Sequence, residues 1–180
     1  MSGVVEQNAW WLLMRGSGVV ALALLTLSVA LGVATTGRSS LGGMPRFATA
    51  ALHRSLSLLG TTFVAVHVLS ALLDRYAQVR LLDAVVPFAA PHRTLWVGLG
   101  ALALDLLVAV VVTSLVRVRL GLRAWRAVHW LSYAIWPVSL AHTLGMGSDA
   151  SAWWLRIGAL VSLLVVAGAV ALRLGRRTGD

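Results

Sequence analysis

Five long apolar runs, separated by short polar breaks, organise the chain. Each run reaches the roughly 20 residues that a helix needs to cross the hydrocarbon core of a bilayer. Backbone groups in lipid must be paired within their own segment, so such runs predict helices rather than open strands. The expected fold is all-α, an integral membrane bundle of five transmembrane helices in a single domain over residues 1–180. The helices are predicted at about 10–36, 52–73, 95–116, 127–146 and 153–174.

Composition supports this interpretation. Hydrophobic residues make up 59% of the chain, charged residues 12%, and the mean hydropathy is +0.86. These values exclude an ordinary soluble domain and indicate a multi-pass protein in contact with membrane lipid, expected in the cell (inner or plasma) membrane. The first run is too long for a signal peptide and no basic segment precedes it, so it is expected to remain as a permanent helix.

The net charge of +9 comes from arginines that cluster in the breaks between the runs. This distribution is typical of topogenic charge, and no nucleic-acid partner is expected. The positive-inside rule places the more basic side in the cytoplasm, with the N-terminus outside and the C-terminus inside. The arginines on the more basic side are Arg38, Arg46, Arg54, Arg117, Arg119, Arg123, Arg126, Arg173, Arg176 and Arg177.

Histidines occupy two of the apolar runs. His53 and His67 are fourteen positions apart, which is about 21 Å along a helix and roughly 40° in direction; His129 and His142 are thirteen positions apart. Ionisable side chains at membrane depth are costly and usually functional. Both helices are predicted to run from inside to outside, so His53 matches the depth of His129 near the cytoplasm, and His67 matches the depth of His142 near the outside. The pattern favours two stacked bis-imidazole sites, and such a site can ligate haem iron.

Several alternatives remain open for these histidines. An ideal helix would turn His142 about 140° away from His129, although Pro137 between them permits a kink or a change of winding. The histidines could also hydrogen-bond within the bundle. A zinc site is less favoured, because zinc prefers four clustered ligands. The fifth histidine, His92, is expected in an outer loop, solvated or involved in docking an acceptor.

Charged residues near the histidines are candidates for binding a cofactor. Arg54 and Arg126 fall at the depth of the inner histidines, where they could pair with haem propionates or act only as topogenic charge. Arg15 lies inside the first run, where it could snorkel outward or, as we favour, hold an outer propionate. Asp105 is expected to be protonated or partnered, and Arg15 is a candidate partner.

The chain resembles the ferric reductase-like transmembrane domain. This haem-bearing membrane core is shared by NADPH oxidases, ferric reductases and the haem membrane subunit of bacterial methionine sulfoxide repair. The resemblance implies that His53 and His129 ligate an inner b-type haem, and that His67 and His142 ligate an outer one. It rests on these four histidines together with Thr113-Ser114, Arg117, Trp125-Arg126, Tyr133 and the turn Gly147-Ser148-Asp149.

The leading hypothesis is a di-haem transmembrane electron-transfer protein, a subunit of a membrane oxidoreductase. No nucleotide-binding G-x-G-x-x-G motif is present and the chain stops at Asp180, so we expect no FAD or NAD(P)H domain of its own. A separate flavoprotein or a quinol is the implied donor. Ferric iron, oxygen and an extracytoplasmic redox partner protein are the candidate acceptors, and the resemblance favours the partner protein. No catalytic residue is assigned. The alternatives are a non-catalytic anchor or scaffold with one haem or none, and a small transporter that uses Asp105 and Arg15.

Overall fold

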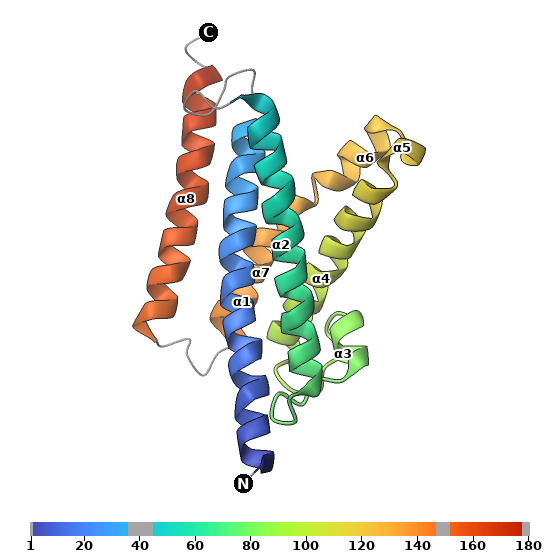
Figure 1. Cartoon of the computed structure of the whole chain (residues 1–180), viewed down its shortest axis with the longest axis vertical. Helices are drawn as coiled ribbons and strands as arrows, with labels where there is room; N and C mark the ends of the chain where they lie inside the picture. The colour runs from blue at the N-terminus through green and yellow to red at the C-terminus, as the bar shows by residue number, and fades with distance from the viewer. Residues whose placement is uncertain (1, 36–44, 147–151, 178–180) are drawn as a thin grey trace.

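The computed structural model describes residues 2–35, 45–146 and 152–177. Within these ranges the regular structure is entirely helical, with no strand (Figure 1). The all-α prediction is therefore confirmed for the described chain. The helices are α1 (Ser2–Thr35), α2 (Arg46–Leu73), α3 (Leu81–Val85), α4 (Thr94–Leu115), α5 (Arg117–Leu120), α6 (Leu122–His129), α7 (Ser132–Met146) and α8 (Trp153–Arg177).

Four of the described helices contain segments long and apolar enough to cross a membrane. They match the first, second, third and fifth predicted runs, so this is a multi-pass membrane protein. Many of the large apolar side chains on α8 are exposed, for example Leu160 at 55% and Leu164 at 62%, as expected for a surface that faces lipid. The four segments are Ala9–Ala34, Arg46–Leu73, Thr94–Leu115 and Trp153–Gly175.

The single helix expected over 127–146 is replaced by two helices. α6 ends at His129 and α7 begins at Ser132, with Trp130 and Leu131 in a turn between them. α7 has 15 residues, too few to span the hydrocarbon core alone. Pro137 lies inside α7, so the interruption falls earlier than the proline suggested. The prediction of five separate spans is thus not confirmed.

The helices pack around α1 and α7. α1 lies between α2 and α8, while α7 contacts both α1 and α4 (Figure 1). The indole nitrogen of Trp136 on α7 donates to Thr26 Oγ1 on α1 at 2.9 Å, and both residues are buried. Leu22, Leu140 and Ala159 surround this contact in one apolar cluster. This cluster joins α1, α7 and α8.

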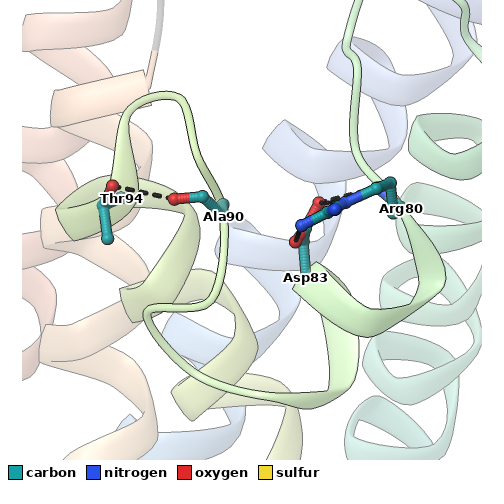
Figure 2. A network of polar contacts seen from close by, with 4 residues as sticks. All are labelled: Arg80, Asp83, Ala90 and Thr94. Carbon is teal, nitrogen blue, oxygen red and sulfur yellow. Dashed lines mark hydrogen bonds and ion pairs between the residues drawn. The ribbon is translucent and has the colours of Figure 1, made fainter.

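A structured segment between α2 and α4, residues 75–93, packs against α4, and we call it the cap. Arg80 directly precedes its short helix α3, and the backbone N–H, Nε and Nη2 of Arg80 all donate to the carboxylate of Asp83 (Figure 2). The Asp83 side chain is fully covered, whereas Arg80 is exposed. Phe88 packs on Gly98 of α4 so closely that a Cβ there would lie 2.2 Å from its ring. The cap is thereby fixed on the start of α4.

The cap should loosen when Asp83 is neutralised. Hydrogen bonds from Arg80 hold the pKa of Asp83 below its ordinary value of 3.8. Their stabilising effect is therefore complete above pH 3.8 and is lost as the pH falls through the lowered folded-state pKa. We expect Asp83→Asn to give several-fold faster amide hydrogen exchange over 75–93 at pH 7. Equal exchange in the wild type and Asp83→Asn would contradict this role.

Candidate functional site

Four of the five histidines meet in two pairs. The imidazole centroids of His53 and His129 lie 6.4 Å apart, with ring planes at 77°. Those of His67 and His142 lie 6.3 Å apart, with planes at 81°. We call the first the inner pair and the second the outer pair, after the orientation expected from the arginines. The structure therefore brings together the same histidines that depth alone had matched in the sequence.

The interruption between α6 and α7 reduces the angle between the directions of His129 and His142. Around it, the amide nitrogens of Leu131, Tyr133 and Ala134 donate to carbonyls three residues earlier. Such tight winding turns about 120° per residue, against about 100° in an α-helix. Each tightly wound residue thus removes about 20° of the 140° offset that an ideal helix would leave.

Three of the four imidazoles are held by backbone carbonyl groups. His67 Nδ1 lies 2.8 Å from Met14 O, and His53 Nδ1 lies 3.0 Å from Ser28 O, both on α1. A carbonyl oxygen only accepts hydrogen bonds, so each Nδ1 carries the proton and Nε2 keeps its lone pair. This is the tautomer that ligates a metal through Nε2.

His142 is also held by a backbone carbonyl, but one of α4 rather than α1. Its Nδ1 lies 2.7 Å from the carbonyl oxygen of Trp96 on α4. α1 therefore anchors both histidines of α2, and α4 anchors the histidine of α7.

A glycine stands four residues after each of these carbonyls. A Cβ added at Gly18 would lie 2.9 Å from His67 Nδ1, and one at Gly100 would lie 2.7 Å from His142 Cε1. At Gly32 the nearest atom, His53 Cε1, would be 3.4 Å away. Helical Cβ atoms tilt toward the N-terminus, so the side chain at i+4 covers the carbonyl at i. Glycine at these positions gives the imidazole access to the carbonyl.

His129 is held differently from the other three. Its Nδ1 is buried and has no hydrogen-bond partner. The ring stacks on Trp125 instead, with centroids 4.9 Å apart and planes at 28°. The Trp125 indole donates to Ser114 Oγ on α4 at 3.2 Å.

A cavity of about 500 Å³ adjoins the outer pair. This is within the range of about 300–1,000 Å³ that is usual for small-molecule and cofactor sites. His67, His142 and both of their neighbouring glycines line it, together with Arg15 and Arg93. The Arg15 guanidinium lies 4.0 Å from the centre of the Trp11 ring, and that of Arg93 donates to the carbonyl of Met146. The outer pair thus lies in a largely apolar cavity with two cationic side chains and the carboxylates of Asp74 and Asp83 on its wall.

The other predicted residues do not line this cavity. Arg54 and Arg126 have exposed side chains, Arg54 directly after His53 and Arg126 one turn before His129. His92 is exposed in the cap, and Asp105 is partly buried on α4 and does not line the cavity. The turn Gly147-Ser148-Asp149 falls outside the described residues.

Each pair fits two imidazoles that share one metal ion. A metal–imidazole bond of about 2 Å places the centroids of two opposed rings about 6 Å apart. Among the described residues no three His, Asp or Glu side chains gather into a metal site. Each layer therefore offers two imidazoles, fewer than the four ligands of a tetrahedral zinc site, but enough to ligate haem iron on both sides.

A known protein family matches most of this chain. Residues 17–140 match the model of the ferric reductase-like transmembrane component. This chain belongs to that family. The matched segment contains His53, His67 and His129 and ends two residues before His142. No curated protein and no solved structure gives a significant match.

Membership makes the chain a transmembrane redox component, of a family that usually binds haem. Several groups at the site could not be identified from the sequence. They are the carbonyls of Met14, Ser28 and Trp96, the stacking of Trp125, and Arg93 on the cavity wall. A sequence signal existed for two of the carbonyls. Gly18 and Gly32 are fourteen residues apart, as are His53 and His67.

Proposed function

We propose that this protein transfers electrons across the membrane by means of two b-type haems, held by His53 with His129 and by His67 with His142. The supporting observation is the presence of two imidazole pairs at 6.4 and 6.3 Å between centroids, stacked along one helix. When bound, the haems would supply one-electron redox chemistry that side chains lack.

The chain's own residues would bind and orient these groups. The carbonyls of Met14, Ser28 and Trp96 hold three imidazoles in the ligating tautomer. Arg15 and Arg93 line the outer cavity, where a haem propionate could pair with a guanidinium. Exposed Arg54 and Arg126 are the corresponding candidates near the inner pair.

The path across the membrane follows from the spacing of the histidines. His53 and His67 are about 21 Å apart on α2, which is long enough to span the bilayer. Because His129 and His142 reach the same two depths, we propose that α6 and α7 together form the fifth crossing of a single domain over 1–180. The arginine distribution then favours an outer N-terminus and a cytoplasmic C-terminus in the cell membrane.

The donor and acceptor are proposed from the same orientation. Electrons would enter at the inner pair from a cytoplasmic flavoprotein or a quinol and leave at the outer pair. The acceptor we favour is an extracytoplasmic redox partner protein. On this proposal the chain is one subunit of a membrane oxidoreductase, and a separate partner could carry a flavin.

The test is an optical spectrum of the purified full-length protein, oxidised and then reduced with dithionite, with haem quantified as pyridine haemochrome. We expect low-spin b-type spectra and two haems per chain. The nearly perpendicular imidazole planes should also give strongly anisotropic ferric EPR signals. A protein that takes up no haem after haem-supplemented expression would contradict the proposal and favour the anchor or scaffold function.

A further inference from the structure

We propose that His129 is the exchangeable ligand of the inner site. Carbon monoxide, or another small neutral ligand of ferrous haem, would take its place, and Trp125 would be the positioning residue that restrains the exchange. This inference rests on the proposed function, because it concerns one of the two haem sites. It assigns to the inner pair a ligand-binding capacity that the outer pair lacks.

The first supporting observation is the unpaired nitrogen of His129. A hydrogen bond from Nδ1 to a carbonyl fixes the ring orientation and makes Nε2 a stronger donor to a metal. His53, His67 and His142 all have that bond, whereas the buried Nδ1 of His129 has no partner. Its bond to a metal is therefore expected to be the weakest of the four.

The second observation is the place of His129 in its helix. It is the last residue of the eight-residue α6, and the turn at Trp130 and Leu131 follows directly. His53 and His67 lie within the 28-residue α2, where the regular backbone continues on both sides. Displacing His129 therefore requires movement of a helix end rather than of a continuous helix.

On α4, the carbonyl at the position equivalent to that of Trp96 does not anchor His129. The carbonyl fourteen residues after that of Trp96 belongs to Val110, and it already accepts from Ser114 Oγ at 2.6 Å and Thr113 Oγ1 at 3.2 Å. Ser114 in turn accepts from the Trp125 indole. The stacked indole is thus the contact that restrains the His129 ring, and it is held in place by Ser114.

The exchange is balanced as a ligand substitution. The bond between the metal and His129 Nε2 breaks, and one bond between the metal and the carbon of carbon monoxide forms. No electron or proton is transferred. In the oxidised state, where carbon monoxide binds poorly, His129 remains the ligand.

The experiment measures carbon monoxide binding to the dithionite-reduced, haem-loaded full chain by stopped-flow absorbance. We expect part of the haem to bind, and Trp125→Ala to increase the rate about three- to tenfold because the stacking contact is lost. Trp125→Phe keeps an aromatic face and should give a smaller increase. Trp130→Ala is the matched control, since Trp130 adjoins His129 in sequence but is exposed and lies against Tyr133.

Two variants that each retain one haem identify the site that binds carbon monoxide. His142→Ala should retain the inner haem and still bind carbon monoxide, whereas His53→Ala should retain the outer haem and not bind it. Binding confined to the outer site, or equal rates in the wild type and Trp125→Ala, would overturn the inference. Haem content is measured first: two haems that are both inert to carbon monoxide refute only the exchange, whereas no haem refutes the proposed function.

Discussion

Alanine at His67 or at His142 is expected to halve the haem content of the purified protein by removing the outer haem. Each imidazole is one of the two that its layer offers, and nothing else among the described residues gathers to replace it. Loss of one axial ligand should remove the low-spin signal of that site and leave the signal of the other. Pyridine haemochrome and EPR together measure both quantities.

His53→Ala should give the complementary result, with the outer signal retained. His92→Ala is the control, because this histidine is exposed in the cap and is expected to leave both haems in place. Added imidazole should restore part of the missing signal in the His67 and His142 variants, which separates ligand loss from misfolding. If His67→Ala and His53→Ala lost the same EPR component, the assignment of ligands to two layers would be wrong.

Much of this arrangement could be predicted from the sequence because the bilayer restricts the options. Apolar length and composition predicted the four membrane-spanning helices in the described chain. Depth along parallel helices predicted which histidines would meet, since His53 and His67 on α2 have counterparts at matching depths on α6 and α7. Neither inference needed side-chain detail.

The break between α6 and α7 could not be predicted in the same way. Pro137 is the strongest local signal for a kink, yet the helix is interrupted at Trp130 and Leu131, where the residues have no marked preference for a turn. α6 is also held by a tertiary contact, the hydrogen bond from the Trp125 indole to Ser114 Oγ on α4. Propensity alone does not contain this information.

The positions of the carbonyl groups that hold the histidines can be predicted in part from the sequence. A backbone acceptor has no residue-type signature, so Met14 and Ser28 could not be singled out directly. The glycine four residues after each one can be, because its spacing on α1 repeats the histidine spacing on α2. Arg93 left no comparable signal: it directly precedes α4, and only the structure shows that it lines the cavity.

Alanine at Gly18 or Gly100 is expected to displace the adjacent imidazole and to cause a severe loss of outer haem. The new methyl group would lie 2.9 Å from His67 Nδ1 or 2.7 Å from His142 Cε1, closer than real Cβ contacts allow. The ring must then move away from its carbonyl. Loss of the hydrogen bond between a ligating imidazole and the group that orients it typically lowers metal affinity about 10- to 100-fold. Haem titration of the apoprotein would measure the change.

The same substitution at two other glycines of α1 provides matched controls. Gly32→Ala should have a smaller effect, on the inner haem, because the contact with His53 would be 3.4 Å. Gly16→Ala should leave both haems in place, since nothing lies within 4 Å of its added Cβ. Alanine also favours the helix by about 1 kcal/mol over glycine, so a general effect of the substitution would be stabilising at all of these sites. Haem loss in the order Gly18, Gly32, Gly16 would therefore reflect contact with the imidazoles, whereas equal loss at Gly16 and Gly18 would show that these glycines do not serve to admit the histidine rings.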